Sequence, residues 1–220
     1  MSITLHGSPI SNYYNKAKLA LLEKGVAFAE ARAGTPGGTT NEAGVLESSP
    51  LGKIPYLTTP DGPLCESQVI LDYVEACWPE PPLLPVQPFA AAKVRELTTF
   101  IDWHLEIVAR RLYGAAFFKG AELPDAEREE IRKQLTANIA AFKRLAKFSP
   151  YVAGDVFTQA DCSAFTSLPV IGMATKAVYG EDLLLAAGID YKDYVKRVSE
   201  RPSAQKVIAD RKAAQARMST

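Results

Sequence analysis

A proline placed between strand-forming residues constrains the fold more than any other feature of the chain. Residues 52–57 read Gly-Lys-Ile-Pro-Tyr-Leu. Inside a sheet, Pro55 can donate no backbone hydrogen bond, and it restricts the conformation of Ile54 before it. Such a proline is tolerated where a bend is useful, often as a cis bond at a sheet edge. We therefore expect the N–H and C=O groups of Ile54 to stay open to pairing with an extended peptide, in the manner of strand addition.

Composition and charge exclude several classes of function. The 220 residues include 25 basic and 25 acidic side chains, so the formal net charge is zero and no overall field favours nucleic acid. The three cysteines and two histidines lack metal-ligand spacing, so we expect no disulfide framework and no metal. No basic segment followed by a long apolar run begins the chain, which predicts a cytoplasmic protein without a membrane partner.

The first 78 residues predict an α/β domain with the order β-α-β-α-β-β-α. The chain stops a first helix at Gly25, turns at Pro60-Asp61-Gly62-Pro63, and offers Ser67 as the cap of a last helix. The expected strands cover 3–5, 26–31, 56–59 and 64–65, and the expected helices cover about 12–24, 42–47 and 67–77.

The remainder of the chain predicts an all-helical domain after a proline-rich linker. Prolines stand at positions 79, 81, 82, 85 and 88. Helical periodicity follows over 90–118, 124–147, 159–173 and 190–200, and again after Pro202. We therefore divide the chain into 1–78, a linker at 79–89, and 90–220. Thr158 and Asp161 have the spacing of a capping box, which predicts a structural role outside the active site.

Five segments in order resemble the cytosolic glutathione transferase family, and the resemblance covers essentially the whole chain. The segments are His-Gly-Ser-Pro-Ile-Ser at 6–11, Leu-Glu-Lys-Gly-Val at 22–26, Gly-Lys-Ile-Pro at 52–55, Glu-Ser-Gln-Val-Ile at 66–70, and Val-Ala-Gly-Asp-Val-Phe-Thr-Gln-Ala-Asp at 152–161. The resemblance is to serine-using bacterial members. It implies a thioredoxin-like domain followed by a helical bundle, a homodimer, and a role in detoxification. It also implies reduced glutathione as co-substrate, with no prosthetic group.

Within this resemblance, residues 53–55 and 66–67 form the expected glutathione site. At a helix start, the Ser67 hydroxyl and amide would hold the γ-glutamyl carboxylate while Glu66 receives the ammonium group. Lys53 would pair with the glycyl carboxylate, and Ile54 and Pro55 would present the strand edge. Judged singly, Ser67 is simply a helix cap, and Glu66 and Lys53 are solvated surface charges.

The expected catalytic residue is Ser11, by similarity to the serine-using classes. A thiolate is the reactive form of glutathione, and a hydroxyl donor at the first helix start would stabilise it. The simpler interpretation of Ser11 is a helix cap, which does not exclude catalysis. Alternative donors are Ser8, Asn12, Tyr13 and Tyr14, and the two tyrosines point about 100° apart on a helix.

The predicted activity is transfer of the glutathione thiolate to an apolar electrophile. One alternative is glutathione-dependent reduction of a disulfide or peroxide. Another is a binding protein that keeps the fold without the chemistry, since threonines stand at 39 and 40 where some relatives present basic residues. The residues do not identify the electrophile.

Overall fold

The computed structural model describes residues 2–34, 43–118, 120 and 122–218. These residues cluster into two compact units, which are described separately below. The first unit combines Met1–Leu84 with Ser199–Thr220, and the second is Pro85–Val198.

A four-stranded sheet forms the centre of the first unit, with the strand order β2-β1-β3-β4. β1 pairs parallel with β2, whereas β3 is antiparallel to both β1 and β4. The strands are β1 (Thr4–Gly7), β2 (Ala29–Arg32), β3 (Tyr56–Thr59) and β4 (Gly62–Cys65). The predicted thioredoxin-like α/β fold is confirmed.

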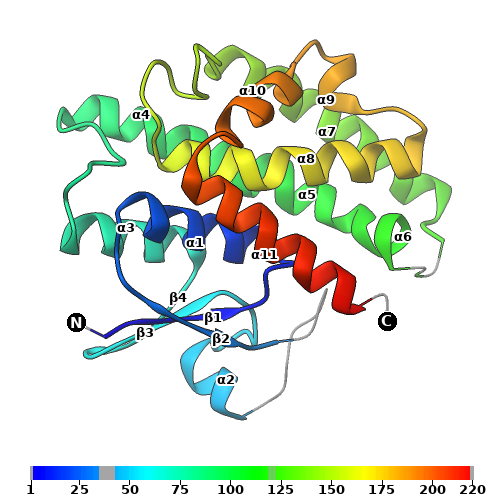
Figure 1. Ribbon diagram of the computed structural model, residues 1–220. Helices are drawn as coiled ribbons and strands as arrows, with labels where there is room; N and C mark the ends of the chain where they lie inside the picture. Colours follow the sequence, from blue (N-terminus) through cyan, green and yellow to red (C-terminus); the bar gives the residue numbers. More distant parts are fainter. Residues whose placement is uncertain (1, 35–42, 119, 121, 219–220) are drawn as a thin grey trace. The chain divides into compact units, whose positions relative to one another are not determined.

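Helices cover both faces of this sheet, as Figure 1 shows: α1 and α3 lie on one face and α2 on the other. Their bounds are α1 (Asn12–Glu23), α2 (Ala43–Ser48) and α3 (Ser67–Cys77). Successive side chains of a strand point to opposite faces of the sheet. Leu5 and Leu57 are fully buried, and the neighbouring Tyr56 points to the face that carries α2, where it packs with Val45. The predicted end of the first helix is confirmed at Gly25, which has a φ of 63°.

The final helix, α11 (Pro202–Met218), packs against α1 within the first unit. The sequence analysis grouped these residues with the helical domain. The contacts that join them to α1 include polar ones: Arg201 and Ser203 both bond to the Glu23 carboxylate, and Lys18 lies 2.5 Å from Asp210.

The second unit is all helical, as the sequence predicts. The long segment predicted for 90–118 is a run of adjoining helices in which Phe100–Glu106 adopts π-helical turns, a form that occurs mostly as short insertions. α8 is largely buried and forms the centre of the unit, and α9 was not predicted. The bounds are α4 (Pro88–Thr99), η1 (Phe100–Glu106), α5 (Ile107–Ala109), η2 (Arg110–Leu112), α6 (Tyr113–Phe117), α7 (Asp125–Leu145), α8 (Gln159–Tyr179), α9 (Leu183–Ala186) and α10 (Tyr191–Val198).

A buried capping box begins α8, as predicted. The Asp161 carboxylate accepts hydrogen bonds from the Thr158 amide (2.8 Å) and hydroxyl (3.0 Å), from the Val152 amide (2.9 Å) and from the Tyr194 hydroxyl (3.0 Å). Burial raises the pKa of Asp161 to about 6, against these hydrogen bonds, which lower it. The contacts give Asp161 a structural role within its own unit.

Among the described residues, no helix combines the length and apolarity that crossing a membrane requires.

Candidate functional site

Strand register brings three separate segments of the first unit to one end of the sheet. His6 of β1 lies opposite Tyr56 of β3, and Tyr56 lies opposite Cys65 of β4. One residue further along each strand, the chain enters the β1–α1 turn, the Ile54–Pro55 bend and the Glu66–Ser67 start of α3. Residues about 40 and 55 positions apart in the sequence therefore border the same surface.

The Ile54–Pro55 peptide bond is cis, so the predicted bend is confirmed. The Ile54 side chain packs against a small apolar cluster of Ala33, Val45 and Tyr56, which fixes its position. No described residue forms a hydrogen bond with the N–H or C=O group of Ile54. A backbone edge that is anchored but unpaired suits an extended peptide.

At the start of α3, Glu66 occupies the N-cap position with a φ of 68°, and Ser67 is the first helical residue. The prediction that Ser67 caps this helix is therefore wrong, because Glu66 holds the cap position. Ser67 is buried, and in the described part of the chain its hydroxyl has no partner. The Ser67 amide and hydroxyl remain available to an anion.

Glu66 and Lys53 are both exposed, and neither side chain pairs with a described residue. They lie beside Ser67 and Ile54 in the sequence, at the same end of the sheet. Charges that are held near a binding edge without partners of their own are available to a zwitterionic ligand. The threonines at 39 and 40 lie outside the described residues.

Ser11 is the N-cap of α1. Its Oγ accepts a hydrogen bond from the Tyr14 amide at 3.3 Å, and its own amide donates to the Ser8 carbonyl at 2.9 Å. The capping interpretation is confirmed. Because the cap uses a lone pair of Oγ, the Ser11 hydroxyl proton remains available for donation.

The alternative donors lie in the same turn and have different surroundings. Ser8 is buried, and its Oγ accepts a bond from the Ile10 amide at 3.4 Å. Asn12 is buried, and Tyr13 is half-buried. The Tyr14 hydroxyl donates to the Glu30 carboxylate, and burial, followed by this bond and nearby negative charge, raises its pKa. A hydroxyl committed to Glu30 is poorly suited to serve a thiolate.

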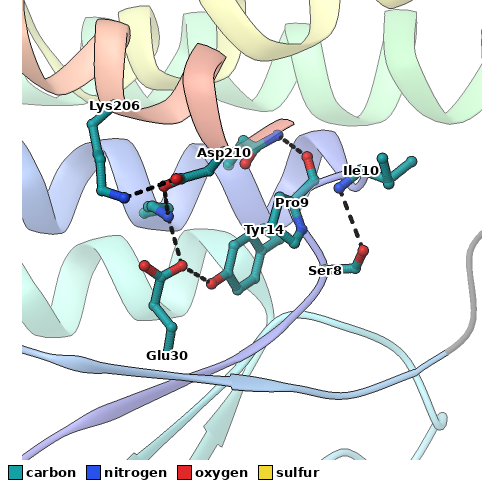
Figure 2. A network of polar contacts seen from close by, with 9 residues as sticks. Ser8, Pro9, Ile10, Tyr14, Glu30, Lys206 and Asp210 are labelled. Atoms are coloured by element: carbon teal, nitrogen blue, oxygen red, sulfur yellow. Dashed lines mark hydrogen bonds and ion pairs between the residues drawn. The ribbon is translucent and has the colours of Figure 1, made fainter. Parts of the chain in front are cut away.

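A network of charges around the buried Lys18 joins α1, β2 and α11 behind this turn (Figure 2). Lys18 lies 2.6 Å from Glu30 and 2.5 Å from Asp210, and Lys206 lies 2.7 Å from Asp210. The side-chain amide of Asn15 holds the turn itself by donating to the Pro9 carbonyl at 2.8 Å. The sequence analysis missed these residues because lysines in a helical pattern normally predict a solvated face.

Sequence comparisons relate this chain to known proteins. Residues 5–82 match the family described as "Glutathione S-transferase, N-terminal domain". A "Glutathione S-transferase" of Pseudomonas putida is 41% identical over 96% of this chain and 93% of its own length. A "Stringent starvation protein A homolog" of Pasteurella multocida is 30% identical over 91% of this chain and 87% of its own.

A solved structure of the same family is also similar to this chain. The glutathione S-transferase of Methylobacterium radiotolerans, in complex with glutathione sulfonate, is 25% identical and covers 94% of each chain with a TM-score of 0.75. Ser11, Ile54 and Ser67, whose segments lie at one end of the sheet, thus all belong to the part of the chain that matches the family's N-terminal domain. The chain belongs to the glutathione S-transferase family.

Proposed function

We propose that this protein is a glutathione transferase that conjugates the glutathione thiolate to an apolar electrophile. The observation that carries the proposal is the meeting of three features at one end of the sheet. These are the unpaired backbone edge at Ile54, the open start of α3 at Ser67, and the Ser11 hydroxyl at the start of α1. The family membership of the chain supports the same activity.

The tripeptide would be held by complementary groups along this edge. The start of α3, with the Ser67 hydroxyl, receives the γ-glutamyl carboxylate, and Glu66 receives the neighbouring ammonium group. Ile54, before Pro55, pairs with the peptide backbone, and Lys53 pairs with the glycyl carboxylate. Each of these groups is exposed or lacks a described partner, so ligand binding breaks no existing contact.

Ser11 would then stabilise the ionised sulfur. An ordinary thiol of pKa near 8.5 is only about 3% ionised at pH 7, and lowering the pKa by roughly two units makes the thiolate the major form. A hydroxyl hydrogen bond to a charged acceptor and the start of α1 together supply a shift of that size. The thiol proton passes to solvent, the sulfur bonds to the electrophilic carbon, and the leaving group departs with its electron pair.

We place this activity in the cytoplasm, in a homodimer that serves detoxification. The three cysteines, all within the described residues, form no disulfide, which suits a reducing compartment. Gel filtration with light scattering tests the dimer. Conjugation is favoured over disulfide reduction because position 11 carries a hydroxyl, whereas thiol exchange through a mixed disulfide needs a cysteine there.

Calorimetric titration with reduced glutathione tests the proposal directly. We expect saturable binding that weakens in Ser67→Ala, with Thr136→Ala, an exposed hydroxyl in the second unit, as the matched control. Assays with a chlorinated nitroaromatic and with a small disulfide then separate conjugation from reduction. Absence of binding at millimolar glutathione would reject the activity and favour a binding protein that only keeps the fold.

A further inference from the structure

A four-residue turn, from Ser8 to Ser11, carries the proposed thiolate donor. The Ser11 amide donates to the Ser8 carbonyl over 2.9 Å, which leaves Pro9 and Ile10 as the two central residues. Ile10 does not have a positive φ, so the turn is not of type II, which requires one at that position. The peptide between the two central residues is the group that reverses between turns of type I and type II. Its orientation therefore determines how the chain enters Ser11.

The Pro9–Ile10 peptide is held at both ends, by the two bonds that are drawn at these residues in Figure 2. Its carbonyl accepts a hydrogen bond from Nδ2 of Asn15 over 2.8 Å, and its N–H donates to Oγ of Ser8 over 3.4 Å. The first distance is favourable for an N–H···O bond, whereas the second lies beyond the favourable range. The Asn15 side chain therefore contributes most to fixing the plane of this peptide.

Asn15 also holds the chain that follows Ser11. Its backbone amide donates to the Ser11 carbonyl over 3.0 Å, while its side chain bonds to the carbonyl two residues before Ser11. Only 2% of Asn15 is exposed, and its helix packs against α3 and α11 within the first unit. A buried side chain on a packed helix has little freedom to move. The backbone before and after Ser11 is thus fixed to the same buried residue.

The residue type at position 15 indicates what this side chain contributes. Asparagine is a poor helix former, and Oδ1 of Asn15 is buried without a hydrogen bond from any described residue. A buried acceptor that lacks a donor destabilises the folded protein. A leucine, which is similar in size, would avoid both effects but could not donate to the Pro9 carbonyl. We therefore attribute the asparagine to that bond.

We propose that Asn15 is a positioning residue of the transferase reaction. It fixes the Pro9–Ile10 peptide and thereby keeps the Ser11 hydroxyl directed at the glutathione sulfur. Asn15 is too buried to contact the tripeptide, so it acts through Ser11. Because a hydrogen bond weakens steeply as its geometry departs from the optimum, a small displacement of Ser11 should raise the pKa of the bound thiol. This inference rests on the proposed function.

Ionisation of bound glutathione measures this role. Thiolate absorbance of the complex against pH should give a thiol pKa about 0.7 units higher in Asn15→Leu than in wild type. Asn15→Ala should give a similar shift, because it loses the same amide donor without gaining a branched side chain. Calorimetry at about pH 5.5, where the bound sulfur stays protonated, should show glutathione affinity within about twofold of wild type. Lys53, Ile54 and Ser67, which hold the rest of the tripeptide, belong to other segments.

Turnover against pH supplies the second readout, with saturating glutathione and a chlorinated nitroaromatic. If the thiol pKa is about 6.5 in wild type, this shift lowers the thiolate fraction about fourfold at about pH 6 and about twofold at about pH 7. At about pH 8.5 the thiolate predominates in both proteins. The kcat of Asn15→Leu should fall by these factors and recover at the highest pH. A general loss of folded protein would instead lower the kcat equally at every pH.

Asn138→Leu is the matched control. Asn138 makes the same kind of bond, from Nδ2 to the His104 carbonyl over 2.7 Å, but it lies in the second unit. This variant should keep the wild-type thiol pKa and kcat. A thiol pKa that stays at the wild-type value in both Asn15 variants overturns the proposal. An equal rise in Asn138→Leu overturns it as well.

A double-mutant cycle tests whether Asn15 acts through Ser11. Asn15→Leu should raise the thiol pKa in the wild-type background and leave it unchanged in the Ser11→Ala background. A further rise in the Ser11→Ala background would assign the effect to another group and overturn this inference alone. Absence of glutathione binding by wild type would instead reject the transferase activity, and the positioning role with it.

Discussion

The backbone N–H of Tyr14 donates to the Oγ of Ser11 over 3.3 Å, and the Tyr14 hydroxyl donates to Glu30. One residue therefore joins the α1 cap to the charge network of β2 and α11. The Tyr14 amide fixes the position of the Ser11 oxygen, and the Tyr14 hydroxyl, which is bonded to Glu30, is not free to donate to the glutathione sulfur.

Replacing Ser11 by alanine should impair ionisation of the bound thiol. The start of α1 remains in this variant, so the thiol pKa should rise by about 1–1.5 units, and the conjugation rate at pH 7 should fall about three- to eightfold as the thiolate fraction decreases. Thiolate absorbance of the glutathione complex against pH measures the shift, and calorimetry should show binding retained. Ser11→Thr keeps both hydroxyl and cap, and should stay near wild type. Full activity in Ser11→Ala would reject the catalytic role.

Replacing Gly7 by alanine should destabilise the turn before Ser11. A Cβ at this position would lie 2.5 Å from Cδ2 of Tyr14, and the φ of 153° disfavours a side chain. We expect a loss of about 2–4 kcal/mol in the free energy of unfolding, measured in urea. Gly25→Ala adds backbone strain without a clash, since no atom lies within 4 Å, and should cost about 1 kcal/mol. Equal losses would contradict the role of Tyr14 packing.

Replacing Lys24 by methionine should break a buried polar centre. Its ammonium lies 2.8 Å from Glu75, 2.6 Å from the Trp78 carbonyl and 2.8 Å from the Pro81 carbonyl. The variant leaves these acceptors without a cation, and we expect a loss of about 3–5 kcal/mol in urea unfolding. Lys206→Met removes an exposed lysine that pairs with Asp210, and should cost less than about 1 kcal/mol. Similar losses of stability in Lys24→Met and Lys206→Met would contradict the greater contribution expected of the buried lysine.

Asp161 should make stability depend on pH. Burial raises its pKa in the folded protein to about 6, above the ordinary value of 3.8. The folded state thus binds the proton more tightly, and this contribution to stability is fully present below the ordinary value and is lost as the pH rises through about 6. The stability of wild type relative to Asp161→Asn should fall by on the order of 2–3 kcal/mol between about pH 4 and about pH 7.5. Because other groups cancel in this difference, a constant value would contradict the raised pKa.

The sequence predicted those features of the fold that depend on a few neighbouring residues. Pro55 restricts its own neighbour, Gly25 ends its own helix, and Thr158 and Asp161 lie three residues apart, so each could be recognised from a few adjacent residues. Glu66 was harder, because its positive φ and its place at the cap depend on how β4 meets α3.

The remaining errors concern contacts between distant segments. Lys18 reads as a surface lysine until Glu30 and Asp210 are placed around it, and Asp210 follows Lys18 by 192 residues. For the same reason the packing of α11 against α1 had no local signal in the sequence.

The return of α11 to α1 has a consequence for synthesis of the protein. The first 84 residues are synthesised before the second unit, but the helix that completes their unit is synthesised after it. The first unit can therefore be completed only after α11 has been synthesised, and an expression fragment that stops at the linker would leave Lys18 without Asp210 and Glu23 without Arg201.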